Sequence, residues 1–186
     1  MEQNFKTLTE ILIDRGYPID LKCDEDNLEF RKENEITKIC CKLKSRATKN
    51  TITETIENLI ELNYQGKQVI IIIINETLTN SLFSVQRNIY KKYGDLDLLL
   101  QIIPCYRITY NIKNHSKYIK HEKLSEQEKQ DLLKELFIED ENKLPKISIN
   151  DAISFYAQLK PGDVCRITRP SNSTGFTYYY RLCVFD

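Results

Sequence analysis

Few residues of this chain combine the type and spacing that catalysis requires. The triplet Glu141-Asn142-Lys143 has the Glu-x-Lys letters of a magnesium-dependent nuclease, which needs paired carboxylates and a lysine at strand ends. It follows an expected helix, however, and lies outside the part of the chain where parallel strands are expected. A nuclease is therefore only an alternative interpretation.

The histidines and cysteines give no clear metal site. His115 and His121 are six residues apart, which is typical of neither one helical face nor a metal-binding pair, and they fit a connection between domains. The six cysteines include no Cys-x-x-Cys pair, and the polar, acidic N-terminus is unlike a secretory signal, so reduced thiols are expected. Phosphate-binding and dinucleotide-binding glycine motifs and a serine nucleophile elbow are absent from the sequence. Neither a cofactor nor a metal is predicted.

One basic cluster could contact DNA. The formal net charge is zero, so binding to nucleic acid would depend on a local patch. Five basic residues lie between Glu35 and Glu54 with no acid among them, which fits either a solvated face or contacts with DNA phosphates. They are Lys38, Lys42, Lys44, Arg46 and Lys49.

Hydrophobic periodicity predicts an α/β domain over residues 1–105. Helical spacing recurs in three segments, and two apolar segments read as strands, of which Gln68–Asn75 is a continuous β-branched run expected to be buried on both faces. A strand, a helix and a strand of these lengths form a parallel βαβ unit. The expected helices are 5–12, ended by Gly16, then 52–60, broken by Gly66-Lys67, and 82–93; the second strand is 95–105. The longest apolar run, Val69–Ile74, is too short to span a bilayer.

Residues 106–186 are predicted to form a small α+β module. Ser125 and Glu128 have the spacing of a capping box, which opens a helix with Leu132, Leu133 and Leu136 on one face. A shorter helix begins after Asp151, and Pro161-Gly162 turns into a terminal hairpin.

Both faces of the predicted hairpin carry side chains suited to burial. Pro170 has no N–H to donate, so strand pairing is expected to end near Arg169. The return strand alternates an apolar and aromatic face with a second face that carries Tyr179 and Arg181. Tyrosine and arginine are enriched at protein interfaces, although tyrosines of an ordinary core explain the pattern equally well.

The C-terminal sequence resembles a known family. Residues 144–184, LPKISINDAISFYAQLKPGDVCRITRPSNSTGFTYYYRLCV, are similar to the assembly module of the fifth subunit of eukaryotic nuclear RNA polymerases, which is shared with the corresponding small subunit of archaeal RNA polymerases. Upstream, His115, His121 and Leu124-Ser125 fit the family pattern, whereas Ala152, Phe155 and Gln158 depart from it. The matching residues are Leu144-Pro145, Asp151, Gly162-Asp163-Val164, Arg169-Pro170-Ser171, Gly175 and Tyr180-Arg181-Leu182.

The resemblance implies a non-catalytic subunit of a multisubunit DNA-directed RNA polymerase. Asp14-Arg15-Gly16-Tyr17 is similar to a signature of the eukaryotic jaw domain, so residues 1–105 would form a jaw near downstream DNA, touching it weakly and without sequence specificity through the basic cluster. Residues 106–186 would anchor to the largest subunit, without a membrane partner. The implied anchoring residues are His115, His121, Arg169, Pro170, Ser171, Gly175, Tyr180 and Arg181.

The jaw region is shorter than in the nuclear subunit, and only three residues of the chain are alanine. These features predict a copy encoded by a large DNA virus, found in the virion and host cytoplasm; otherwise the expected location is the nucleus. The alternatives from other classes are a nuclease-like α/β enzyme and a free-standing interaction adaptor.

Overall fold

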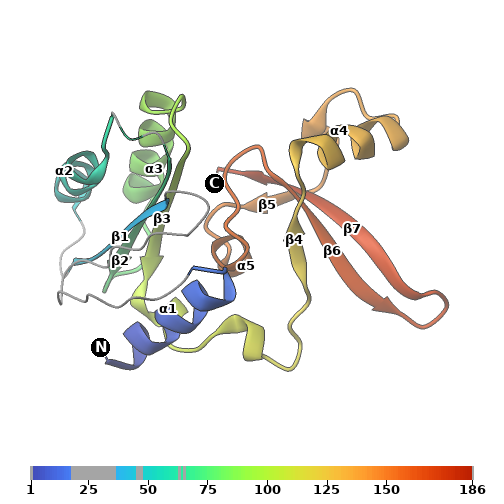
Figure 1. Cartoon of the computed structure of the whole chain (residues 1–186), viewed down its shortest axis with the longest axis horizontal. Helices are drawn as coiled ribbons and strands as arrows, with labels where there is room; N and C mark the ends of the chain where they lie inside the picture. The colour runs from blue at the N-terminus through green and yellow to red at the C-terminus, as the bar shows by residue number, and fades with distance from the viewer. Residues whose placement is uncertain (1, 18–36, 45–47, 63, 65, 186) are drawn as a thin grey trace. The chain divides into compact units, whose positions relative to one another are not determined.

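The computed structural model describes residues 2–17, 37–44, 48–62, 64 and 66–185 (Figure 1). Contacts divide the chain into two compact units, Met1–Asn111 and Ile112–Asp186. The elements of the first unit are α1 (Glu2–Asp14), β1 (Thr37–Lys44), α2 (Lys49–Leu59), β2 (Lys67–Ile74), α3 (Asn80–Lys92), β3 (Leu98–Pro104) and η1 (Cys105–Ile108).

The first unit is built on a parallel sheet of order β1-β2-β3, which confirms the predicted α/β arrangement. Every residue of β2 from Gln68 onward is buried, because the strand is central and covered on both faces. One face packs in a single cluster against α2 and α3, which contribute Ile52, Ile56, Val85 and Ile89. The other face includes Gln101 of β3, whose side-chain oxygen accepts a hydrogen bond of 3.4 Å from Arg15, directly after α1. The buried residues of α1 are therefore placed to cover this second face.

Two helix ends in this unit have identifiable causes. Gly16 follows α1 with a φ of 80°, a left-handed conformation that glycine adopts without strain, as the sequence predicted. Helix α2 ends at Leu59, within one residue of the predicted range 52–60 and before Gly66-Lys67, which was expected to break it. The buried Gln68 side chain accepts from the Glu61 N–H (3.0 Å) and donates to the Glu61 carbonyl (2.8 Å). These bonds satisfy backbone groups that a longer helix would have used.

The second unit is a four-stranded mixed sheet of order β4-β6-β7-β5 with two helices. β6 pairs antiparallel with both β4 and β7, and β5 lies parallel to β7. The α+β content and the terminal hairpin agree with the sequence prediction. Its elements are η2 (Ile112–Asn114), β4 (His121–Lys123), α4 (Glu126–Glu135), η3 (Glu141–Lys143), β5 (Lys146–Ser148), α5 (Ala152–Tyr156), β6 (Val164–Ser171) and β7 (Gly175–Val184).

Helix α4 is fixed to the sheet by its cap and its apolar face. The predicted capping box is present: the Glu128 N–H donates to Ser125 Oγ (3.3 Å), and the Glu128 carboxylate accepts from the Ser125 N–H (2.8 Å). Leu132 then packs in one core cluster with Val164 and Leu182 of the hairpin. Leu136, which was predicted on this apolar face, is instead the C-cap residue and is exposed.

The prediction that pairing ends near Arg169 was wrong. Pro170 pairs with Phe176, and Ser171 pairs with Gly175. Strand β4 reaches only as far as Ile167 along β6, so Pro170 lies on an open edge. The missing N–H of a proline is tolerated at an edge strand, because it interrupts no ladder there.

Candidate functional site

The distal part of the β6–β7 hairpin extends beyond its neighbours in the sheet. β4 pairs only with residues 165–167 of β6, and β5 pairs only with residues 182–184 of β7. Within the described residues, 169–171 and 175–181 therefore have a strand partner on one side only. We call residues 166–181, which include this segment and the residues just before it, the ribbon; its far end is the long arm formed by β6 and β7 in Figure 1.

The first face of the ribbon carries a stack of aromatic and basic side chains. The rings of Phe176 and Tyr178 lie 5.2 Å apart, and the Arg166 guanidinium lies 5.4 Å from the centre of the Tyr178 ring. Arginine is attracted to the face of an aromatic ring, and its flat group can stack there. This arrangement holds Tyr178 and Arg166 in fixed relative positions.

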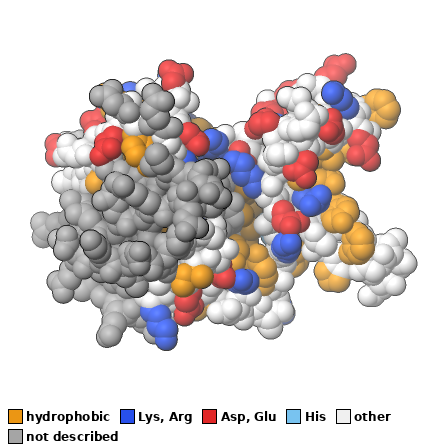
Figure 2. Space-filling model, viewed as in Figure 1, with side chains coloured by type: hydrophobic (Ala, Val, Ile, Leu, Met, Phe, Trp, Pro, Cys, Tyr) orange, Lys and Arg blue, Asp and Glu red, His pale blue; other side chains and the backbone are white. Residues whose placement is uncertain are grey.

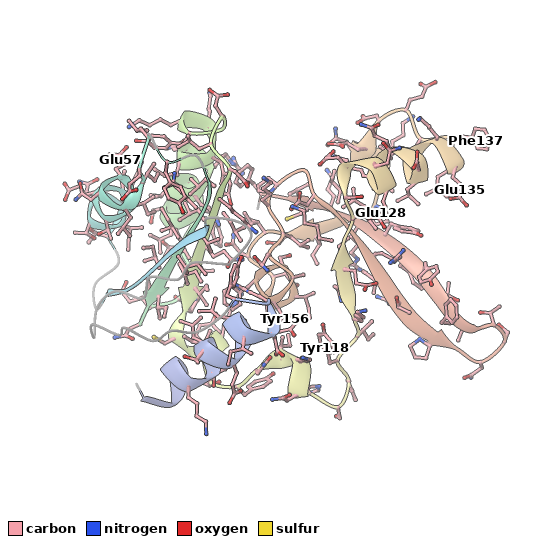
Figure 3. The ribbon with its side chains drawn as sticks, in the orientation of Figure 1. Glu57, Tyr118, Glu128, Glu135, Phe137 and Tyr156 are labelled. Carbon is pink, nitrogen blue, oxygen red and sulfur yellow. The ribbon has the colours of Figure 1, made fainter. Side chains whose placement is uncertain are left out.

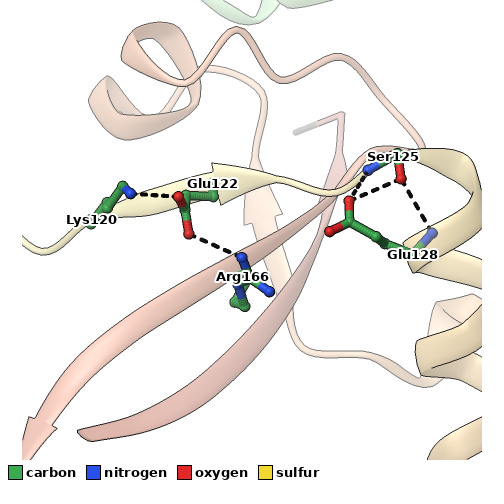
Figure 4. Close-up of polar contacts among 5 residues, drawn as sticks. All are labelled: Lys120, Glu122, Ser125, Glu128 and Arg166. Carbon is green, nitrogen blue, oxygen red and sulfur yellow. Dashed lines mark hydrogen bonds and ion pairs between the residues drawn. The ribbon is translucent and has the colours of Figure 1, made fainter.

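Glu122 of β4 positions Arg166 on this face, opposite it in the strand register. The Glu122 carboxylate accepts from Arg166 Nη2 at 3.2 Å and contacts Lys120 Nζ at 2.5 Å (Figure 4). The hydrogen bond from Lys120, and then that from Arg166, lower the pKa of Glu122 below its ordinary value. Glu122 is thus ionised at neutral pH and bridges two cations.

The second face brings His121 close to two arginines. His121 pairs with Ile167, Arg169 lies two residues further along β6, and Arg181 lies opposite Cys165. Burial is the largest effect on His121 and lowers its pKa; Arg181 and Arg169 lower it further by repulsion, while the hydrogen bond between Nδ1 and the Ile119 carbonyl (2.7 Å) acts in the opposite direction. His121 is therefore neutral at pH 7.

Arg169 lies 4.7 Å from the centre of the Tyr179 ring, so each face of the ribbon contains one arginine on one tyrosine. The Nε atoms of Arg166 and Arg169 are both buried without a hydrogen-bond partner. Meanwhile the rings beyond them are open: Phe176, Tyr178 and Tyr179 are 53%, 45% and 48% exposed. Large aromatic rings left in solvent beside arginines have the composition of an interface that another protein covers.

The predicted anchoring residues do not all lie together. His121, Arg169 and Arg181 share one face of the sheet, whereas Tyr180 and Pro170 lie on the opposite face. Ser171 and Gly175 form the last pair before the turn, and Gly175 has a φ of 77°. His115 is exposed just after η2, where its Nδ1 accepts from the Lys117 N–H. It lies outside the strands of the sheet and pairs with no residue of the ribbon.

Sequence reasoning missed Glu122 and Arg166. The segment before Lys123 was interpreted as a connection, because a strand of three residues has too few positions to reveal alternation. Once β4 is paired with β6, however, the register places Glu122 directly opposite Arg166. A search for opposite charges across a predicted strand pair would have found them.

The described residues provide no alternative chemical centre. No group of three or more histidine, cysteine or carboxylate side chains that could hold a metal occurs among them. Burial raises the pKa of Cys165 to about 11, so its thiol is neutral and unreactive at physiological pH. Glu141 of the nuclease-like triplet forms an ion pair with Lys129 at 2.5 Å. Within the same described segments, no helix has the length and apolar character needed to cross a bilayer.

Comparison with known proteins identifies the second unit. Residues 110–183 match the family described as RNA polymerase Rpb5, C-terminal domain. The DNA-directed RNA polymerase subunit Rpo5 of Thermococcus kodakarensis is 43% identical over 77 residues, which are 41% of this chain and 93% of that protein. The chain belongs to the Rpb5 family. The resemblance found in the hairpin sequence is thereby confirmed.

Other members of the Rpb5 family match the same part of the chain. Subunit Rpo5 of Archaeoglobus fulgidus is 43% identical over 75 residues, which are 40% of this chain and 97% of that protein. The rpabc1 subunit of RNA polymerases I, II and III from Dictyostelium discoideum is 40% identical over 74 residues, which are 40% of this chain and 37% of that protein. The ribbon and strands β4 to β7 all lie within the Rpb5 match, apart from the last residue of β7.

Proposed function

We propose that this chain is a non-catalytic subunit of a multisubunit DNA-directed RNA polymerase, anchored to the largest subunit through the ribbon. The observation that carries the proposal is the pair of exposed arginine–tyrosine stacks on the ribbon, within a segment that matches 93% of an archaeal polymerase subunit. The chain would act wherever that polymerase transcribes. An origin in a large DNA virus stays a prediction.

The chemistry of the ribbon suits an anchor. Tyr178 and Tyr179 offer large, rigid contact areas on opposite faces, and each is already ordered by an arginine, so little side-chain entropy is lost on binding. The open edge of β7 can also accept a strand from the partner.

The first unit has a separate proposed role. We infer that residues 1–105 form a jaw near downstream DNA and that residues 106–186 form the assembly module. Of the basic cluster, Lys38, Lys42 and Lys44 lie along β1, Lys49 is exposed at the start of α2, and Arg46 lies outside the described residues. A row of lysines meeting phosphates would bind DNA weakly and without reading its sequence.

The anchoring proposal is tested by co-purification. Tagged wild-type chain should recover the largest and other polymerase subunits, whereas Tyr178→Ala/Tyr179→Ala should recover less than about one tenth of them, since interface tyrosines often contribute about 2 kcal/mol or more. The control is Leu62→Ala, which removes an exposed large apolar side chain from the first unit. Normal recovery by the ribbon variant, with both variants folded by circular dichroism, would refute anchoring through the ribbon.

The nuclease alternative makes an opposite prediction. Magnesium-dependent cleavage of DNA or RNA by the pure chain, abolished by Glu141→Gln, would support it. We expect no cleavage, because the Glu141 carboxylate is engaged by Lys129 in a short 3-10 turn rather than at a strand end. A free-standing adaptor would instead recover partners other than polymerase subunits.

A further inference from the structure

We infer that the C-terminal end of α4 is a second protein-binding surface, separate from the ribbon, whose partner offers an apolar pocket rimmed by lysine or arginine. The surface consists of Glu135, Leu136, Phe137 and Glu139, and we call it the α4 knob. It goes beyond the proposed function, because anchoring through the ribbon requires nothing at this end of the helix.

Phe137 is the central residue of the knob. Its side chain is 94% exposed, and that of Leu136 is 45% exposed. Figure 3 shows the Phe137 ring at the end of α4, directed away from the rest of the helix. A phenylalanine that gains almost nothing from the fold of its own chain is a typical anchor for another protein's pocket.

The backbone conformation of Phe137 is one in which a phenylalanine is unfavourable, which supports a role for its side chain. Its φ is 54°, in the left-handed region, where an L side chain with a Cβ is strained and glycine or asparagine is favoured. The Ile138 N–H donates to the Leu133 carbonyl at 2.8 Å. This is the hydrogen bond of a Schellman motif, in which the left-handed residue Phe137 ends the helix. This position therefore costs the free chain stability through backbone strain, and the exposed ring contributes no burial in return.

The surrounding charge indicates the chemistry of the partner. Residues 126–141 contain seven acidic and two basic side chains, and Figure 2 shows acidic groups beside exposed apolar atoms over this region. Glu135 is the last residue of α4, where a negative charge opposes the helix dipole. An exposed apolar group within an acidic surface is complementary to an apolar pocket with a basic rim.

Gln158 has the same backbone conformation as Phe137 and can serve as a control for the effect of strain alone. Gln158 also takes a left-handed conformation, with a φ of 56°, directly after the C-cap residue of α5, as Phe137 does after that of α4. The Leu159 N–H donates to the Ser154 carbonyl at 3.0 Å, so the helix ends in the same way as α4. Gln158 is polar and half-buried, and thus shares the backbone of Phe137 without its exposed ring.

The first test compares stability with assembly. Phe137→Asn should raise the melting temperature of the free chain by about 2 °C, since asparagine tolerates the left-handed region. In a polymerase purified through this chain, with the photo-cross-linker p-benzoylphenylalanine placed at the neighbouring exposed position Leu136, the same variant should lose at least about half of the cross-linked contact with the partner. Gln158→Asn should leave that contact unchanged. A lower melting temperature for Phe137→Asn would show that the ring stabilises its own fold and would overturn the inference.

The second test identifies what the knob touches. Phe137 is replaced by the photo-cross-linker p-benzoylphenylalanine, the assembled complex is purified and irradiated, and the cross-linked peptide is sequenced by mass spectrometry. The expected peptide belongs to another protein and carries more lysine and arginine than acid. Cross-linking should fall about threefold between roughly 0.1 and 0.5 M salt, as for a screened attraction. Glu135→Gln/Glu139→Gln should reduce it similarly, whereas the control Glu54→Gln/Glu76→Gln in the first unit should not.

The outcomes distinguish the two proposals. If polymerase subunits are absent from the purified complex, the proposed function fails, whatever Phe137 contacts. If they are present but position 137 gives no cross-link, links only to this chain or a second copy of it, or links to an acidic or neutral peptide, the inference about the α4 knob is refuted and the proposed function stands.

Discussion

The bridge from Glu122 to Arg166 allows a quantitative test of how the ribbon is held. We expect Glu122→Gln to loosen the pairing of β4 with β6, because the variant loses the charge that binds Arg166 at 3.2 Å and Lys120 at 2.5 Å. The side chains of Glu122 and Arg166 are each 33% exposed, so solvent screens their attraction and a value of about 0.5–1 kcal/mol is appropriate. Lys120 is 66% exposed and should contribute less, although its hydrogen bond is the larger cause of the lowered pKa.

Hydrogen exchange measures this locally. The Leu124 N–H donates to the Val164 carbonyl at 2.9 Å and reports opening between β4 and β6. In the variant, its exchange should be about two to five times faster, which corresponds to about 0.5–1 kcal/mol of opening free energy. In a double-mutant cycle with Arg166→Gln, the coupling free energy between the two residues should account for most of this opening free energy. The coupling free energy from a cycle with Lys120→Gln should be smaller.

The pH dependence supplies the refuting result. Because the folded pKa of Glu122 is lowered, its stabilisation is fully present above the ordinary value of 4.5 and is lost as the pH falls through the folded pKa. The difference between wild type and Glu122→Gln should therefore be constant at neutral pH and disappear in acid. Equal exchange in both proteins at neutral pH, or a difference that persists in strong acid, would refute the bridge.

Three further predictions concern the neighbouring surfaces. His121, whose pKa is lowered chiefly by burial, should destabilise the fold as the pH falls from its ordinary 6.5 to its folded pKa, and His121→Gln should remove this slope in a titration followed by circular dichroism. Arg181→Glu should abolish co-purification of the largest subunit while the free chain keeps its circular dichroism spectrum; unfolding would instead make Arg181 an internal structural residue. Replacing the basic cluster by glutamine should flatten the slope of log affinity against log salt for downstream DNA by roughly two to three units if two or three of its members reach phosphates, and an unchanged slope would indicate a solvated face. The cluster is Lys38, Lys42, Lys44, Arg46 and Lys49.

The elements that were predicted correctly are those whose own residues carry a recognisable pattern. The β-branched run of β2 and the apolar spacing of α3 each extend over two or more turns or pleats, and the capping box of α4 needs only Ser125 and Glu128. The parallel pairing followed from the order of strand, helix and strand. Such local patterns determine structure without knowledge of distant residues.

The features that could not be predicted depend on distant partners. Strand β4 exists because residues 165–167 of β6 accept it, and three residues have no period of their own. Pairing through Pro170 required knowing that β4 stops at Ile167 and leaves an edge. The same limit applied to the site: alternation along the return strand already separated Arg181 from Tyr180, but only the strand register places His121 and Arg169 on the face of Arg181.

The open edges of the ribbon have a consequence for the life of the chain before assembly. A two-stranded segment with unpaired backbone groups and exposed rings can template strand pairing with any similar chain, which is a route to aggregation. Pro170 interrupts the donor row on the β6 edge, but β7 has no proline from Gly175 to Val184. Chains made in excess over the proposed partner would therefore precipitate or be degraded, so the cellular abundance of this protein should follow that of the polymerase subunit to which the ribbon is proposed to anchor.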